Sequence, residues 1–146
     1  DVADAQRVWR AMDAGVSAAA QSIPERARNA RVYFEVNSAP YAAGESSFIG
    51  ETLTRLGARN IVPAALGPFP KINPEFVVRA NPDVIMVGDA TFAGMAQRPG
   101  WAGMPAIKAK RICVFTPEQS DIMVRPGPRM AEAARLMAEC LKDKTP

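Results

Sequence analysis

Five carboxylates stand in segments where an acid or base could serve a reaction: Glu35, Glu45, Asp89, Glu118 and Asp121. Acid–base catalysis by carboxylates commonly uses a pair of acids whose environments separate their pKa values. None of the five forms a close pair in the sequence, and no Gly-X-Ser-X-Gly nucleophile elbow is present. We therefore interpret them as solvated loop acids, and we predict that the protein is not an enzyme.

Histidine is absent from the sequence, which excludes a His-based triad and a histidine general base. The cysteines, Cys113 and Cys140, belong to no Cys-X-X-Cys pair, which argues against a zinc site. We predict no metal centre and no cofactor. Each cysteine lies in an apolar segment, so we interpret both as small buried hydrophobic residues. A disulfide between them stays open, because spacing does not decide it.

The stretch from Gly44 to Gly50 superficially resembles a phosphate-binding loop. Its spacing is one residue too long, and Glu51 stands where such a loop places a lysine. A dinucleotide-binding Gly-X-Gly-X-X-Gly motif is also absent. We interpret the stretch as a turn into the N-terminus of a helix.

Helices and strands alternate along the chain that positions these residues. Strands are indicated by β-branched and aromatic runs, and helices by apolar periodicity with capping and stop residues. The predicted strands are 31–36, 60–62, 83–87 and 111–115. The predicted helices are 2–23, 46–58, 74–80, 92–97, 104–109 and a last one that opens at Pro128. The predicted loops are 37–45, 64–72, 88–92 and 116–127.

This alternation predicts an α/β fold of three layers, a parallel sheet with helices on both faces. Ligands of such folds gather beyond the carboxyl ends of the strands. The aromatic residues Tyr41, Phe69 and Phe92 fall in the predicted loops, and Asp121 and Arg125 share the loop before the last helix. Aromatic side chains with a few polar groups are typical of a small-molecule pocket.

Composition fits one globular domain of 146 residues with a net charge of +3. Lys and Arg form no tract, so nucleic acid is not a predicted partner. No apolar run approaches the roughly 20 residues that a membrane span needs. The first residues lack the basic start and apolar core of a signal peptide, but a mature or truncated chain would begin in the same way.

Four segments occur in a characteristic order: NIV, PFPKINPEFVVRANPDVIMV, PGWAGMPAIKAKRICVF and RPGPRMAEAARLMAECL. Together they resemble the C-terminal lobe of periplasmic substrate-binding proteins of the helical-backbone class, which serve ABC importers of cobalamin and ferric siderophores. The resemblance runs from about Arg31 to Leu141. Its most specific pieces are Asn81 to Ile85, Pro99 to Trp101 with Ala106 to Lys108, and Arg125 to Arg129.

The resemblance implies one lobe of a two-lobe protein that binds a ferric siderophore, another metal chelate or a corrinoid between its lobes. Residues 1–24 would be a helix from the interlobe linker, and residues 25–146 would be the C-terminal α/β lobe. An N-terminal lobe and a signal peptide would precede this chain. The other partners would be the ABC permease subunits, and the location would be the periplasm or, through a lipid anchor, the outer face of the membrane.

Site residues follow from the same resemblance. The residues it places at the ligand are Tyr41, Phe69, Asp89, Asp121 and Arg125. Glu75 matches an exposed carboxylate that docks on arginines of the permease. With no histidine, this lobe offers no imidazole to haem iron or to cobalt. Tyr33 and Tyr41 could ligate iron, but we expect Tyr33 to be buried in its strand.

Two other classes of protein stay open at this point. One is a small α/β enzyme or nucleotide-binding domain. The other is a scaffold or sensor domain that has kept the fold and lost transport. A signal peptide or lipobox with a second α/β lobe upstream would favour the binding lobe.

Overall fold

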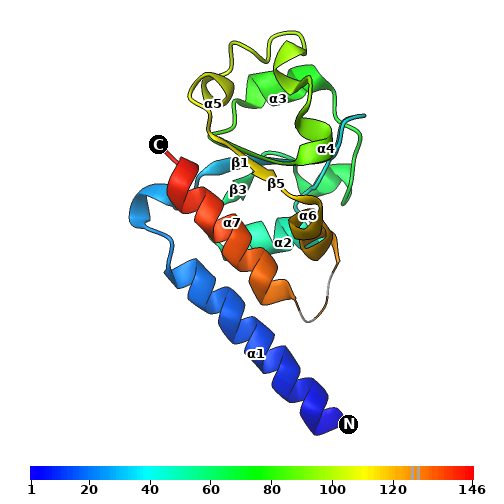
Figure 1. Ribbon diagram of the computed structural model, residues 1–146, viewed down its shortest axis with the longest axis vertical. Coiled ribbons are helices and arrows are strands. Elements are labelled where there is room, and N and C mark those ends of the chain that lie inside the picture. The colour runs from blue at the N-terminus through cyan, green and yellow to red at the C-terminus, as the bar shows by residue number, and fades with distance from the viewer. Residues whose placement is uncertain (126, 128) are drawn as a thin grey trace.

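The structure, a computed structural model, describes residues 1–125, 127 and 129–146, and the strands within them form one five-stranded sheet (Figure 1). The strands are β1 (Arg31–Asn37), β2 (Tyr41–Ala42), β3 (Arg59–Asn60), β4 (Val84–Gly88) and β5 (Ile112–Phe115). β1 pairs in parallel with β3 and β4, and β4 pairs in parallel with β5. The predicted parallel sheet is confirmed for these four strands.

β2 departs from the parallel arrangement, because it pairs antiparallel with the end of β1. The Asn37 side-chain oxygen accepts a hydrogen bond from the Ala39 N–H at 3.0 Å, which closes the turn between the two strands. β2 and β3 share one side of β1, with β3 at its start and β2 at its end. The predicted loop 37–45 is therefore a short hairpin that places Tyr41 in a strand.

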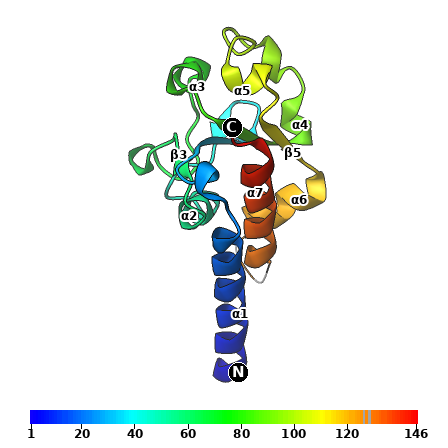
Figure 2. The same cartoon turned by 90° about the vertical axis from the view of Figure 1, so that its left-hand side faces the viewer.

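Helices cover both faces of the sheet, as predicted. They are α1 (Val2–Gln21), α2 (Phe48–Arg55), α3 (Pro74–Ala80), α4 (Asp89–Phe92), α5 (Pro105–Lys108), α6 (Pro117–Val124) and α7 (Met130–Lys144). One face packs against α3 and α5, and the other packs against α1, α2, α6 and α7 (Figure 2). The three-layer arrangement predicted from the sequence is thus present.

Side chains of β1 and β4 alternate between two hydrophobic cores. Val32, Phe34 and Met86 join the core under α1, α2, α6 and α7. Tyr33 and Ile85 join the core under α3 and α5. Because both faces of these strands are covered, their sequences are nearly continuous apolar runs rather than alternating ones.

The largest departure from prediction lies after β5, where the sequence predicts a loop over 116–127 and the structure has α6. The Thr116 hydroxyl accepts from the Gln119 N–H at 3.2 Å, and the Gln119 side chain accepts from the Thr116 N–H at 3.0 Å. Pro117 occupies the first helical position. The predicted start of the last helix at Pro128 lies outside the described residues.

One smaller prediction is also wrong. The helix predicted over 92–97 is replaced by α4, which ends at Phe92, and by a 3-10 turn over Met95–Gln97. Gly94 separates them with φ of +77°, a conformation that suits glycine. β5 is not fully buried, because it forms an edge of the sheet, and Val114 is 41% exposed. α3 has the predicted bounds, and the other predicted elements are present with ends shifted by one or more residues.

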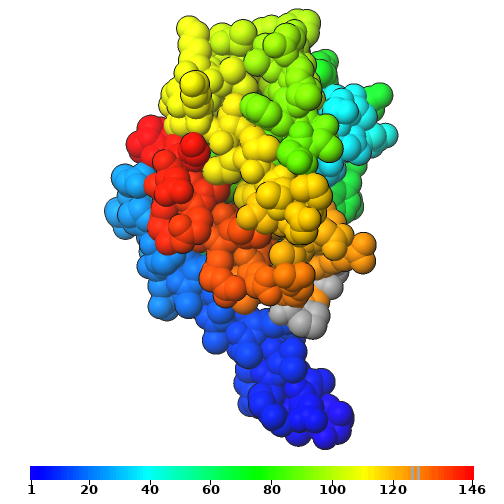
Figure 3. All heavy atoms as spheres, viewed as in Figure 1, coloured from blue at the N-terminus to red at the C-terminus, as the bar shows by residue number. Residues whose placement is uncertain are grey.

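α1 packs on the rest of the protein only along its C-terminal half. Val16 and Ala19 are buried, and a Cβ added at Gly15 would lie 2.5 Å from the Ala131 Cβ, so glycine permits a close crossing of α1 and α7. Towards its N-terminus the helix projects from the body (Figure 3), and Trp9 is 61% exposed. The apolar periodicity that predicts this helix therefore corresponds to a buried face only in its second half. Within the described residues, no helix combines the length and the apolar character of a membrane span.

Cys113 of β5 and Cys140 of α7 form a disulfide, with their Cα atoms 6.0 Å apart. The preferred interpretation of two unpaired buried thiols is therefore wrong, and the alternative that the spacing left open is correct. The bond attaches the last helix to the edge strand, and it closes a sequence separation of 27 residues.

We expect removal of this disulfide to lower the free energy of unfolding by about 3.5 kcal/mol, the loop-closure value for that separation. Guanidinium denaturation with and without a thiol reductant measures the change. The variant Cys113→Ser/Cys140→Ser is the control, because reductant should not move its transition. Identical midpoints for the oxidised and reduced wild-type protein would show that the bond does not stabilise the fold.

Candidate binding site at the carboxyl edge of the sheet

Four parallel strands end at one edge of the sheet, which we call the carboxyl edge: Asn37, Asn60, Gly88 and Phe115. In a parallel sheet the segments that follow the strands gather at this edge. All the residues predicted to contact ligand lie in segments that follow these strand ends.

Tyr41 and Phe69 come from two segments that run side by side. The Ala42 N–H donates to the Pro70 carbonyl at 3.0 Å, and Tyr41 forms a β-bridge with Lys71. Tyr41 is 38% exposed and Phe69 is 46% exposed, although aromatic rings of this size are usually covered. The loop after β3 is thus fastened to the hairpin, and both exposed aromatics belong to one rim.

The charged candidates lie in the middle of the carboxyl edge and at its other end. Asp89 is exposed and begins α4 directly after β4. Asp121 and Arg125 form an exposed ion pair on α6, with 2.8 Å between Oδ1 and Nε. A Cβ added at Gly88 would lie 3.1 Å from the Ser120 Oγ, so α6 packs on the end of β4 beside Asp89.

Tyr41 and Phe69 therefore lie at the hairpin end of the edge, Asp121 and Arg125 lie at the other end, and Asp89 lies between them. The order β2, β1, β4, β5 separates the hairpin from the strand that leads into α6 by three strand spacings, or about 14 Å. Phe92 is exposed at the end of α4, which follows the middle strand β4. This spread suits a large ligand better than a small one.

Glu75 lies in the first turn of α3, outside the segments that directly follow the strand ends, and it is exposed. The Asn73 side chain accepts from the Glu75 N–H at 2.9 Å, and Pro74 occupies the first turn, as the sequence predicts. The carboxylate therefore stands on a rigidly capped turn.

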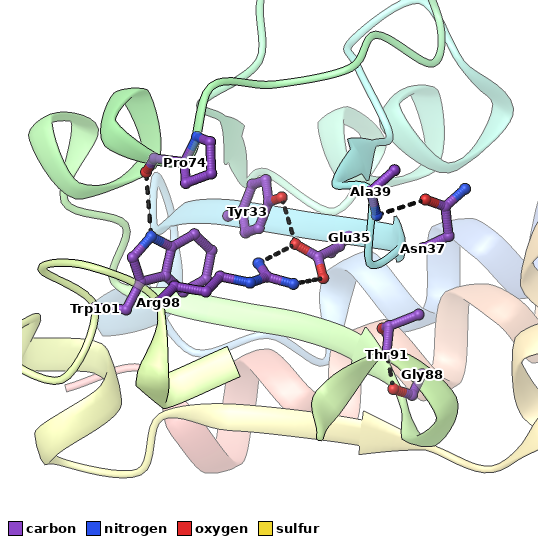
Figure 4. Close-up of polar contacts among 9 residues, drawn as sticks. All are labelled: Tyr33, Glu35, Asn37, Ala39, Pro74, Gly88, Thr91, Arg98 and Trp101. Carbon is purple, nitrogen blue, oxygen red and sulfur yellow. Dashed lines mark hydrogen bonds and ion pairs between the residues drawn. The ribbon is translucent and has the colours of Figure 1, made fainter. Parts of the chain in front are cut away.

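A buried polar cluster, absent from the sequence-based predictions, lies behind the carboxyl edge (Figure 4). The Arg98 guanidinium donates to both oxygens of Glu35, at 2.7 and 2.9 Å, and the Tyr33 hydroxyl donates to Glu35 Oε1 at 2.7 Å. Arg98 also lies over the Trp101 ring, 4.6 Å from its centroid. The Trp101 indole N–H donates to the Pro74 carbonyl at 3.2 Å. The cluster thereby joins β1, the segment after α4 and the start of α3.

Burial sets the electrostatics of this cluster. The Glu35 side chain is 0% exposed and that of Arg98 is 16% exposed, so each charge depends on the other. Burial, reinforced by the neighbouring Glu35 carboxylate, raises the pKa of Tyr33 well above its ordinary value. The hydrogen bonds to Glu35 raise the pKa of Arg98. The phenol therefore stays protonated at neutral pH.

The interpretation of Glu35 as a solvated loop acid is therefore wrong. It sits in β1 two residues after Tyr33, on the face covered by α3 and α5. Strand alternation could have placed it there, and a buried carboxylate requires a partner. Glu45, Asp89, Glu118 and Asp121 are exposed, as predicted, and Tyr33 is buried, as predicted.

Neither a cluster of metal-ligating side chains nor an open phosphate-binding loop is found among the described residues. Within the described residues, no group of three or more His, Cys, Asp or Glu side chains is placed to hold a metal ion. The stretch from Gly44 to Gly50 folds back on itself, and a Cβ at Gly50 would clash with the Gly44 carbonyl oxygen. The Ser47 side chain caps α2 inside this turn. The turn is therefore occupied by its own backbone.

Comparison with known families identifies the chain. Residues 3–119 match the family described as periplasmic binding protein, so the chain belongs to that family. Its members are solute-binding proteins. The family inferred from the sequence is confirmed. No curated protein matches the chain.

Solved structures share the fold over about half of their length. A possible iron-binding periplasmic solute-binding protein from Staphylococcus epidermidis is 24% identical with a TM-score of 0.81, over 94% of this chain and 54% of that one. The periplasmic heme-binding protein BhuT, in complex with two hemes, is 25% identical with a TM-score of 0.75, over 98% and 55%. The vitamin B12 binding protein BtuF of Vibrio cholerae is 18% identical with a TM-score of 0.72, over 92% and 51%. Coverage of this kind fits a single lobe.

Replacing Arg98 by Met should lower the free energy of unfolding by about 3–5 kcal/mol, because it leaves the Glu35 charge buried without a partner. Arg125→Met is the matched control, since it breaks the exposed pair with Asp121 and should cost less than about 1 kcal/mol. Urea denaturation of both variants measures the difference. Equal losses of unfolding free energy in the two variants would show that burial does not make the Glu35–Arg98 pair more important than the exposed pair.

The pKa of Tyr33 predicts a loss of stability in alkali. The chain has two tyrosines, so Tyr41→Phe leaves Tyr33 as the only phenol. The unfolded variant should ionise at about pH 10, whereas the folded variant should not. Because the unfolded state releases its proton first, the contribution of Tyr33 to stability is complete below about pH 10. It then falls by up to about 1.4 kcal/mol per pH unit above it.

Ultraviolet titration of tyrosinate in the Tyr41→Phe variant measures this directly. We expect the tyrosinate signal to appear together with unfolding, as followed by circular dichroism. A signal near pH 10 from protein that is still folded would contradict the burial of the Tyr33 hydroxyl.

Proposed function

We propose that this chain is the C-terminal lobe of the substrate-binding protein of an ABC importer, and that it binds a metal chelate or a corrinoid at its carboxyl edge. The observation that carries the proposal is the gathering of exposed aromatic side chains, Tyr41, Phe69 and Phe92, along that edge. Exposed rings on segments fastened to a sheet are available to a ligand with large flat or apolar surfaces.

The chemistry of the edge favours packing over metal ligation. The chain has no histidine, and the Tyr33 hydroxyl is engaged by Glu35. Tyr41 is the remaining phenol, on an exposed strand. We infer a ligand whose metal is already enclosed by its own chelator, such as a ferric siderophore, a haem or a corrinoid. Asp89, Asp121 and Arg125 would then meet polar groups on its periphery.

We assign residues 1–24 to the linker between the lobes and residues 25–146 to the lobe itself. The N-terminal half of α1 carries three apolar residues that nothing in the described structure covers: Val2, Val8 and Trp9. A preceding lobe of similar size would cover them. The half-length matches to solved structures support the same arrangement.

We place the protein in the periplasm, or on the outer face of the membrane through a lipid anchor. A disulfide supports this location, since such bonds persist in oxidising compartments. We also propose that Glu75 docks on an arginine of the permease. Its exposed carboxylate on a capped turn supports this role, because a guanidinium can bind a carboxylate through two parallel hydrogen bonds.

The test is a thermal-shift screen of the full-length binding protein against haemin, cyanocobalamin and ferric hydroxamates. The true ligand at a hundredfold excess over its Kd should stabilise the protein by about 2.7 kcal/mol. Phe69→Ala should weaken its binding by about tenfold, because a ring is lost from the contact. Glu75→Ala should leave the affinity unchanged and lower uptake into cells.

Phe69→Ala and Glu75→Ala control for each other, because the first tests ligand binding and the second tests docking on the permease. Leu66→Ala is a further control, since Leu66 is exposed in the same loop as Phe69 and is assigned no role. No stabilisation by any chelate, or equal affinities for Phe69→Ala and wild type, would count against the ligand site. Normal uptake by Glu75→Ala would remove it from docking.

A further inference from the structure

Lys71 lies directly opposite Tyr41, with which it forms an antiparallel β-bridge. Two hydrogen bonds join the residues on either side of this pair, at 3.0 and 2.9 Å: Ala42 N–H to the Pro70 carbonyl, and Ile72 N–H to the Pro40 carbonyl. Tyr41 and Lys71 are therefore a non-hydrogen-bonded pair, the kind in which opposing side chains come closest. The Lys71 side chain leaves the same face of this short ribbon as the Tyr41 ring.

The backbone around this pair is firmly held. We call residues 40–44 and 68–72 the aromatic rim. The Gly44 N–H donates to the Pro68 carbonyl at 2.8 Å. The side chain of Asn60, which ends β3, donates to the Ala43 carbonyl at 2.9 Å and accepts from the Val62 N–H at 2.9 Å. The ammonium of Lys71 is thus carried on a backbone that is joined to the sheet.

Lys71 is also available to a ligand. It is exposed, and it takes part in none of the ion pairs found among the described residues. Three cations occur in the segments that leave the carboxyl edge, 38–47, 61–73, 89–98 and 116–125: Lys71, Arg98 and Arg125. Arg98 is paired with Glu35, and Arg125 is paired with Asp121. Within the described part of these segments, Lys71 is therefore the one cation that forms no ion pair.

The acids of the edge do not cancel this charge. Asp89 follows β4, two strand spacings from the hairpin, and Asp121 lies beyond β5, three spacings away. Those spacings are about 9 and 14 Å, and charges are screened over about 8 Å at physiological ionic strength. Glu45 is closer in sequence, but it is not within ion-pair distance of Lys71. The hairpin end of the edge thus presents a positive charge beside aromatic rings.

This combination fits a particular kind of ligand. Phe69 lies two residues before Lys71, within about 7 Å along the chain, so two exposed rings and one ammonium belong to the same rim. Rings contact the apolar part of a ligand, and an ammonium donates charge-assisted hydrogen bonds to an anionic oxygen. A single lysine matches the single charge of a carboxylate, because it acts as a point charge on a flexible stem.

We propose that Lys71 is a specificity residue of the ligand site, and that the ligand carries a peripheral carboxylate which pairs with the Lys71 ammonium. The apolar part of the ligand packs on Tyr41 and Phe69. The proposal rests on the function proposed above. It adds an anionic group to the ligand and a contact residue to the site.

The test compares two ferric trihydroxamates that differ at one end of the chelator. One is the ferric complex of N-succinyl desferrioxamine, which ends in a carboxylate, and the other is that of N-acetyl desferrioxamine, which is neutral there. Calorimetry with the full-length binding protein should show about fivefold tighter binding of the succinyl complex. The preference should shrink in about 0.5 M salt. Equal affinities, or tighter binding of the acetyl complex, would overturn the proposal and leave the proposed function standing.

Variants assign the preference to one side chain. Lys71→Met should bring the two affinities together, whereas Lys71→Arg should keep the succinyl complex ahead, because it retains the charge. Lys108→Met is the matched control, since Lys108 is an exposed lysine of α5, and it should show the wild-type preference. A preference that survives in Lys71→Met would overturn the proposal.

If neither trihydroxamate binds, a smaller pair of probes decides. Naphthoate and naphthamide share one ring system and differ in charge. In an amide chemical-shift titration of the full-length protein, naphthoate should shift residues 40–44 and 68–72 more than naphthamide does, and Lys71→Met should remove the difference. That result would retain the carboxylate contact and count against trihydroxamates as cargo. Equal shifts from the two probes, or no shifts, would overturn the role of Lys71.

Discussion

The buried carboxylate of Glu35 is the constraint on which the α3 and α5 side of the sheet depends. A charge that is 0% exposed must be neutralised, and Arg98 does so from a segment 63 residues later in the chain. That pairing brings Trp101 under the start of α3 and fixes the turn that follows Arg98. The Glu35–Arg98 ion pair in the interior therefore helps to fix the surface on this side, including the turn that carries Glu75.

Much of the fold could be predicted because its signals are local. Asn73, Pro74 and Asn81 bracket α3 by capping and chain-breaking, and the apolar run of β4 identifies a strand covered on both faces. α6 was missed because a helix of eight residues with few apolar positions shows little periodicity, although its capping box is legible in T-P-E-Q. β2 and the disulfide depend on pairing across the chain, which no local pattern specifies.

The candidate site could likewise be predicted only in part. The topology of a parallel sheet predicts which loops share an edge, and the structure places Tyr41, Phe69 and Asp89 in segments that leave that edge. The topology does not predict how these residues are spaced along the carboxyl edge. The Phe69 loop pairs with the hairpin, whereas Asp121 and Arg125 lie in and just after α6, which follows the edge strand β5. The alternation of side chains along β1 predicts that Glu35 faces inward. The pairing of Glu35 with Arg98 is visible only in the three-dimensional structure.

The free half of α1 has a mechanical consequence. The helix leaves α7 near Gly15, and residues 1–11 are exposed, a rod of about 15 Å with unbroken backbone hydrogen bonds. A domain connected to this end of α1 would be joined to the sheet by a rigid helix and not by a flexible loop. Its swing relative to the sheet would be limited to the few degrees that a straight helix bends.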